Sequence, residues 1–288
     1  RDLLGEDVEV DVEFPPDEEM LGLDNNARAL QITPLHTERY MEGAEALANR
    51  LYDVWVERLA CDVESTGVQE CVETFIEEFG LRTWRRPLSE DERTRFIEVY
   101  GVGAQTDEDE ARGGLTLVIE AMLQSPRFIY RIENQQGDGT LWPVAGYELA
   151  SRLSYLIWGA PPDKALYSAA ANGALSEPAQ LEAQVRRMLK DPRAVDRSVT
   201  FLREWLNLDH LANLRPSKKS FPNWNPALAT DMRAETVAFF KEIVWKQNRP
   251  LSDLLNAQVT FLTPGLAKHY RLPLIQPGQG PTRYDLAK

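Results

Sequence analysis

The feature that most constrains this chain is the recurrence of apolar side chains at the spacing of an α-helix. In the segment 34–59, one helical face carries Leu35, Tyr40, Ala44, Leu47, Leu51, Val54 and Trp55. Thr33 and Pro34 precede this stripe, and such a pair is typical of a helix N-terminus. Similar stripes return as far as residue 270, separated by breaks rich in Pro and Gly. They predict a second helix from about Val68 to Phe79 with Gly80 as its C-terminal cap, and a long helix at residues 227–247. The pattern predicts an all-α protein.

The breaks also predict how the helices are grouped. The clearest linker is the segment NQQGDGT at residues 134–140. We therefore expect an irregular multi-helix bundle of about ten helices in two packed units, with an extended N-terminal segment. The predicted domains are an extended segment at 1–33, a helical domain at 34–134, and a larger helical domain at 141–288 that ends in an extended tail.

The charge of the chain argues against two classes of partner. Its 32 basic and 45 acidic side chains give a net charge of −13. Such a body repels the phosphates of nucleic acids and of anionic membrane surfaces. No apolar run approaches the roughly 20 residues that a membrane-spanning helix needs. We expect neither nucleic-acid binding nor membrane insertion, and the partner is an unknown protein or another domain of the same polypeptide.

The segment RTWRRPLSEDE, at residues 82–92, is the most unusual local cluster. Trp84 is flanked in this segment by three arginines, Arg82, Arg85 and Arg86. Ser89 and Glu92 form a capping box that begins the next helix. The arginines have three possible uses, which are to stack on the indole, to pair with the acids of that helix, or to clamp an anionic ligand. We favour a buried structural anchor.

Residues that carry chemistry do not form a recognisable motif. The chain has three histidines but no HExxH or GxSxG motif, so its catalytic residues, if any, stay unknown. Three residues are pocket candidates. His269 and Tyr270 lie in an aromatic region, and Glu235 lies on a long aromatic helix. The cysteines have neither CxxC spacing nor a nearby His pair, so we predict no metal site.

The two cysteines, Cys61 and Cys71, leave two interpretations open. A turn at Ser65, Thr66 and Gly67 separates them and would let two helix ends approach each other. A disulfide closing this loop would stabilise the fold by roughly 2–3 kcal/mol. The alternative is a pair of free, half-buried thiols in a cytosolic protein. Composition does not decide between them.

Segments along nearly the whole chain resemble a known family. The first set is RDLLG and FPPDEEMLGLDNN, the second is CVETFIEEFGLRTWRRPLSEDE and LVIEAMLQSPRFIYRIE, and the third runs from YELASRLSYLIWGAPPDKAL to TFLTPGLAKHYRL. In this order they resemble the domains of unknown function fifteen-eighty-seven, fifteen-ninety-five and fifteen-ninety-two. These domains occur in exported multidomain proteins of planctomycetes and myxobacteria, often fused to a c-type cytochrome domain.

The resemblance implies more than the residues alone. It implies a periplasmic or extracellular protein in which Cys61 and Cys71 form a disulfide. It also implies that residues 1–33 are the end of a truncated first domain and that the protein continues beyond both ends. The sequence contains no CxxCH motif, so no cofactor is expected within the chain and any c-type haem would belong to a separate domain.

The function stays unknown, and three hypotheses follow from these observations. In the first, the chain is the helical scaffold of an exported, cytochrome-associated protein that works in periplasmic electron transfer or in oxidative polymer catabolism. In the second, it is a non-catalytic binding or assembly module that docks a partner through the loops around Trp142 and Trp224. The third is an exported glycan-active hydrolase, which requires two carboxylates that converge on a cleft.

Overall fold

The computed structural model describes the chain in six stretches, which are residues 12–16, 30–58, 67–133, 144, 146–273 and 280–286. Within these stretches the side chains of residues 53 and 55–58 are not described. The chain forms two compact units. Unit 1 consists of Arg1–Asp17 and Gln31–Arg187, and unit 2 consists of Glu18–Leu30 and Met188–Lys288.

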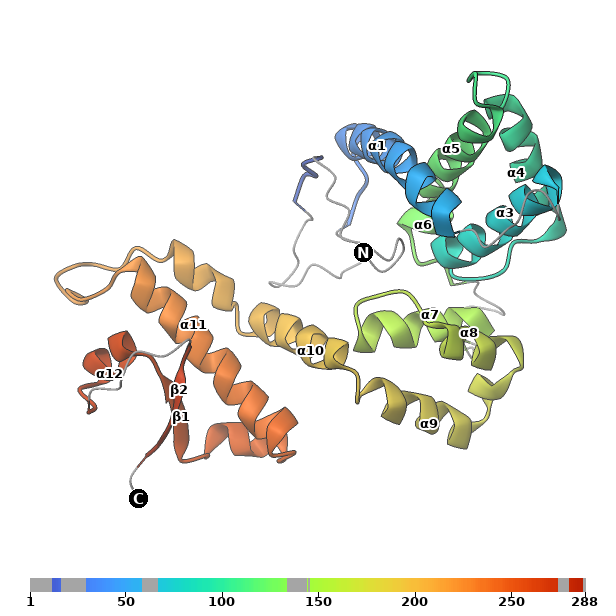
Figure 1. The fold of residues 1–288 in the computed structure, drawn as a ribbon. Coiled ribbons are helices and arrows are strands. Elements are labelled where there is room, and N and C mark those ends of the chain that lie inside the picture. The colour runs from blue at the N-terminus through green and yellow to red at the C-terminus, as the bar shows by residue number, and fades with distance from the viewer. Residues whose placement is uncertain are drawn as a thin grey trace. The chain divides into compact units, whose positions relative to one another are not determined.

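Unit 1 is built from helices. The longer ones are α1 (Pro34–Arg58), α3 (Val68–Trp84), α4 (Glu90–Gly103), α5 (Glu110–Leu123), α7 (Gly146–Ile157) and α9 (Pro178–Met188), whose last residue begins unit 2. The shorter ones are α6 (Pro126–Ile129), α8 (Lys164–Ala171) and the 3₁₀ turn η1 (Ala174–Ser176). Figure 1 shows α1, α3, α4 and α5 gathered into one bundle, with α7 and α8 packed against each other.

The bundle of α1, α3, α4 and α5 encloses one continuous apolar core. Phe75 and Phe79 lie one turn apart on α3, and both are fully buried with their ring centroids 5.4 Å apart. Ala48 of α1 and Val118 of α5 are also fully buried in this core. Burying a side chain of the size of phenylalanine contributes roughly 1.5–3 kcal/mol. Of the apolar stripe predicted at residues 34–59, Ala44 and Leu51 are buried in this core, whereas Leu35 is 44% exposed.

Helix α3 continues one turn further than the sequence predicts. Gly80 was the predicted C-terminal cap, but it lies inside the helix, which ends at Trp84 with Arg85 in the left-handed conformation (φ 60°). A Cβ atom at residue 80 would lie 2.7 Å from the side chain of Leu88. Glycine is present there because the side chain of Leu88 needs the space, and not because a helix ends there.

Two further contacts complete unit 1. The backbones of α4 and α5 approach closely, since a Cβ atom at Gly103 would lie 2.4 Å from the carbonyl oxygen of Gly113. The hydroxyl of Tyr167 on α8 donates to the carbonyl of Leu81 on α3 at 3.3 Å. This hydrogen bond joins the pair of α7 and α8 to the end of α3, where the unusual arginine segment begins.

Unit 2 combines helices with a small sheet. Its helices are α10 (Pro192–Trp205), α11 (Pro226–Phe240) and α12 (Pro264–Tyr270), with the 3₁₀ turns η2 (Leu208–Asn213) and η4 (Leu251–Leu255) and the π-helical turn η3 (Lys241–Lys246). Strands β1 (Val259–Leu262) and β2 (Thr282–Asp285) pair antiparallel, with Val259 opposite Asp285. Figure 1 shows both strands beside α11, and α11 contacts β1 and α12.

The predicted fold class is confirmed, because the structure is mostly helical and carries only this one small sheet in its described part. One long helix was predicted at residues 227–247, but the regular helix ends at Phe240 and η3 continues it. The predicted boundary at 134–141 lies outside the described residues, so the three domain ranges stay predictions. Among the described helices, none has the length and apolar character needed to cross a membrane.

Candidate functional site

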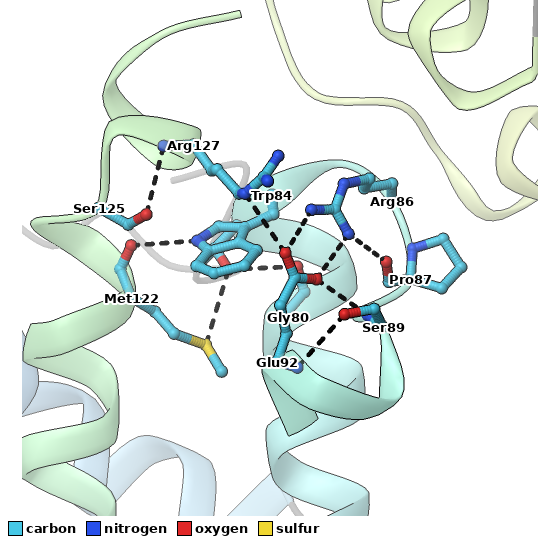
Figure 2. Close-up of polar contacts among 10 residues, drawn as sticks. Gly80, Trp84, Arg86, Pro87, Ser89, Glu92, Met122, Ser125 and Arg127 are labelled. Atoms are coloured by element: carbon cyan, nitrogen blue, oxygen red, sulfur yellow. Dashed lines mark hydrogen bonds and ion pairs between the residues drawn. The ribbon is translucent and has the colours of Figure 1, made fainter. Parts of the chain in front are cut away.

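The arginine segment of unit 1 forms a compact cluster around Trp84. We call it the Trp84 cluster, and its members are Trp84, Arg86, Glu92, Met122 and Arg127 (Figure 2). The residues come from the end of α3, the start of α4, the end of α5 and the short helix α6. Two connections of the chain, between α3 and α4 and between α5 and α6, therefore meet at one indole ring.

Local sequence rules place Glu92. Ser89 is the N-cap of α4, and its hydroxyl accepts a hydrogen bond from the backbone N–H of Glu92 at 3.3 Å. The carboxylate of Glu92 returns a bond by accepting from the backbone N–H of Ser89 at 2.9 Å. This is the predicted capping box, and it is confirmed. The box fixes the carboxylate on the side of α4 that faces Trp84 (Figure 2).

Two arginines share the carboxylate of Glu92. Arg86 donates from both terminal nitrogens at 2.8 Å, which is a bidentate pairing, and Nε of Arg127 lies 3.3 Å from Oε1 of Glu92. The guanidinium carbons of Arg86 and Arg127 each lie 5.7 Å from the centroid of the Trp84 ring. The indole N–H of Trp84 donates to the carbonyl of Met122 at 3.4 Å. Charge and ring contacts thus hold these two connections of the chain together.

These contacts lower the pKa of Glu92 to about 2, from an ordinary value of 4.5. The hydrogen bonds from Arg86 make the largest contribution, and the backbone N–H of Ser89 adds to it, whereas partial burial opposes it. Glu92 is therefore ionised near neutral pH, where it acts as an anchor and not as a proton donor.

Arg85 lies under this cluster and is almost fully buried, with 6% of its surface exposed. Its guanidinium donates to the carbonyl oxygens of Arg127 at 2.5 Å, Phe128 at 3.2 Å and Tyr130 at 2.7 Å. These acceptors lie at or near the C-terminal end of α6, where the helix dipole favours a cation. Arg85 thus fastens the segment after α5 to the end of α3. The structural-anchor interpretation agrees with these contacts.

The same residues border a small cavity, which we call the arginine cavity. Its cationic lining consists of Arg85, Arg86, Arg127 and Arg131, and Trp84 and Tyr147 supply aromatic walls. Sequence reasoning singled out Arg85, Arg86 and Trp84, but it did not connect them with Arg127, Arg131 or Tyr147. These residues are 40 or more positions further along the chain, and no local pattern predicts that the chain returns to this place.

The predicted pocket candidates lie in unit 2, and the structure brings them together. The hydroxyl of Tyr270 donates to Glu235 at 2.7 Å, and the hydroxyl of Thr260 donates to the other oxygen of the same carboxylate. His269 neighbours Tyr270, with the ring centroids 5.4 Å apart. Burial and the bond to Glu235 both raise the pKa of Tyr270. Their role at a pocket stays a prediction.

A second carboxylate on α11 has a similar partner. Asp231, one turn before Glu235, accepts a hydrogen bond from the hydroxyl of Thr263 at 2.7 Å. A Cβ atom at Gly265 would lie 2.6 Å from the Asp231 carboxylate, so this glycine leaves room for it. Sequence reasoning missed Asp231, Thr260 and Thr263. The one available signal was that Asp231 and Glu235 are four residues apart, which places them on the same face of a helix.

The remaining predictions on chemistry concern sulfur and metal. Cys61 lies outside the described residues, so its pairing with Cys71 stays a prediction. Cys71 is buried on α3, and the described stretches contain no free thiol. In the same stretches, no group of three or more His, Cys, Asp or Glu side chains is arranged to hold a metal ion. Trp142, one of the two predicted docking residues, also lies outside the described residues.

Three family models match successive parts of the chain. Residues 1–53 match PSD3, a protein of unknown function (DUF1587), and residues 71–133 match PSD5, a protein of unknown function (DUF1595). Residues 144–272 match PSD4, a protein of unknown function (DUF1592). The chain therefore contains these three domains in tandem, in the order that the sequence predicted. The comparisons with curated proteins and with solved structures gave no match.

Proposed function

We propose that this chain is the helical scaffold of a longer exported protein, and that it holds a c-type cytochrome domain of the same polypeptide in place. The protein would work in the periplasm or outside the cell, in electron transfer or in the oxidative breakdown of polymers. The haem would belong to the cytochrome domain and not to this chain. Three tandem domains of unknown function along one chain are compatible with such a role.

One observation carries the scaffold proposal. In the described stretches, the carboxylates that could take part in a reaction instead join elements that lie apart in the sequence. Glu92 joins Arg86 to Arg127, and Glu235 joins α11 to both β1 and α12. Both carboxylates therefore use their acceptor oxygens for contacts within the fold.

A docking role has its own support. Phe201 and Trp205 lie one turn apart on α10, with ring centroids 6.0 Å apart and 54% and 61% of their surfaces exposed. Large exposed aromatic side chains are typical of surfaces that bind another protein. Trp224, by contrast, is partly buried and packs against the apolar cluster that contains Leu228 and Leu266. If the chain is an assembly module, we therefore place its contact at Phe201 and Trp205 and not at the predicted Trp224 loop.

The hydrolase alternative has the weakest support. It requires two carboxylates that converge on a cleft. Asp231 and Glu235 are the nearest approach to such a pair, but threonine or tyrosine hydroxyls already donate to both of them. We assign these two residues a fastening role.

The test uses the full-length gene product, purified from the periplasm or the culture medium. The scaffold proposal expects the absorption bands of a c-type haem, and it expects the double variant Phe201→Ser, Trp205→Ser to slow haem reduction by an external donor. Asp196→Asn, at a residue of α10 that is 78% exposed, should leave the rate of haem reduction unchanged. A protein without haem absorption, or an equal loss of rate in the double variant and in Asp196→Asn, would contradict the scaffold role.

A further inference from the structure

The arginine cavity of unit 1 has an unusual balance of charge. Among the described residues, four arginines and one acid, Glu148, line it. Glu92 pairs with both Arg86 and Arg127. Within this described part, four positive charges are set against two carboxylates, in a chain whose net charge is −13. A cavity of one sign attracts the opposite charge.

The arginines are also held in place before any ligand arrives. Arg86 and Arg127 are fixed by Glu92 and by the face of Trp84. Arg85 fixes the segment that carries Arg127 and Arg131, because it donates to the carbonyls of residues 127, 128 and 130. Side chains that are already ordered lose little conformational entropy on binding. The same contacts that stabilise the fold therefore hold the arginines of the cavity in place for binding.

Arg131 differs from the other three arginines. It is exposed, and it pairs with no carboxylate in the described part of the chain. Its guanidinium carbon lies 4.7 Å from the centroid of the Tyr155 ring, which orients the group without neutralising it. An arginine held in this way keeps its N–H donors for a bidentate contact with an oxyanion.

We propose that the arginine cavity binds one oxyanionic group, either the carboxylate of an acidic sugar or a phosphate or sulfate group. Arg131 makes the direct contact, with Arg86 and Arg127 supplying further charge. Arg85 is a positioning residue, because its terminal nitrogens are already bonded to carbonyls. The cavity volume of about 50 Å³ suits a single group of this size. Trp84 and Tyr147 contact the part of the ligand to which the oxyanionic group is attached.

Isothermal titration calorimetry on the 288-residue chain tests this site. Sodium glucuronate, inorganic phosphate and inorganic sulfate are titrated separately, with sodium chloride holding the ionic strength constant. We expect saturable binding of at least one of them, and the strongest binder identifies the source of the oxyanion. Arg131→Gln should weaken that binding at least tenfold and leave the midpoint of thermal unfolding unchanged, since Arg131 is exposed.

Arg186→Gln is the matched control. Arg186 is also in unit 1 and is 73% exposed, but it pairs with Glu182 on α9 and does not line the cavity. It removes the same charge, so a nonspecific electrostatic effect would weaken binding equally in both variants. The proposal is wrong if no probe binds more strongly than chloride, or if Arg131→Gln and Arg186→Gln bind alike. Neither result would bear on the scaffold role, which rests on other residues.

Discussion

The two units of this chain are stabilised by different means. In unit 1, thirteen buried residues from α1, α3, α4 and α5 form one core cluster. The described clusters of unit 2 are separate and hold only four and three buried residues. Apolar burial is non-directional and grows with the area removed from water. The bundle of unit 1 therefore depends on packing, whereas unit 2 needs additional contacts.

Unit 2 obtains these contacts from polar side chains. The carboxylate of Glu242, which is 8% exposed on η3, interacts with Lys246, Gln247 and Arg283. The indole N–H of Trp245 donates to the hydroxyl of Ser198 on α10 at 2.8 Å. Each such bond contributes roughly 1 kcal/mol net, but a buried polar group that loses its partner costs more. A unit with a small apolar core therefore depends more on specific hydrogen bonds and ion pairs within it.

The largest expected effect tests the packed core of unit 1. Phe79→Ala removes a fully buried ring that stacks on Phe75, and we expect it to lower the free energy of unfolding by about 3–5 kcal/mol. Hydrogen-exchange mass spectrometry should show faster exchange in α3 and α5. In unit 2, Phe201→Ala is the control, with an effect of about 1 kcal/mol or less because this ring is 54% exposed. Equal effects would show that the burial of Phe79 does not stabilise the core of unit 1.

A second experiment tests the close packing of α4 against α5 with two substitutions in α4. Gly103→Ala places a methyl group 2.4 Å from the carbonyl oxygen of Gly113, so α4 and α5 must separate. We expect a loss of about 1–3 kcal/mol. Gly101→Ala, in the same helix, meets nothing within 4 Å and should gain about 0.5–1 kcal/mol. Thermal denaturation measures both, and a change of the same sign in both variants would contradict the close approach of these helices.

The third experiment concerns the polar contacts of unit 2. Glu235→Ala removes the acceptor of Tyr270 and Thr260, and we expect a loss of about 1–2 kcal/mol. Exchange should accelerate in β1 and α12 and stay unchanged in α3. Asp196→Ala serves as the control, because Asp196 is 78% exposed and only approaches Lys241 at 3.9 Å. If both variants behave alike, the bonds at Glu235 do not stabilise unit 2.

The fourth experiment concerns a pH dependence in unit 1. The pKa of Glu92 is lowered from 4.5 to about 2, so its contribution to stability is complete above pH 4.5 and is lost as the pH falls toward 2. Glu92→Gln should flatten the profile of the thermal midpoint in this window. Glu182→Gln is the control, since Glu182 is 62% exposed. A Glu92→Gln profile that follows the unmodified protein would show that other acids dominate.

Individual residues show how far sequence reasoning reached into the site. The capping box of Ser89 and Glu92 was predictable, because its two residues lie three positions apart and act on each other's backbone. The hydrogen bond between Glu235 and Tyr270 joins residues 35 positions apart. Both were named as pocket candidates, but no pattern related one to the other. Glycine at residue 80 was misread because a helix cap and a packing position favour the same residue.

By itself the sequence determined the helical class, the segments that form helices, the start of α4 and the three tandem domains. These properties depend on side-chain periodicity, capping and family pattern, which are local or can be recognised along one dimension. Only the tertiary structure decided that Arg86 and Arg127 share Glu92 around Trp84, and that Arg131 lines the same cavity. Such contacts arise when packed helices bring distant residues together, and the energy of that packing is shared among many side chains.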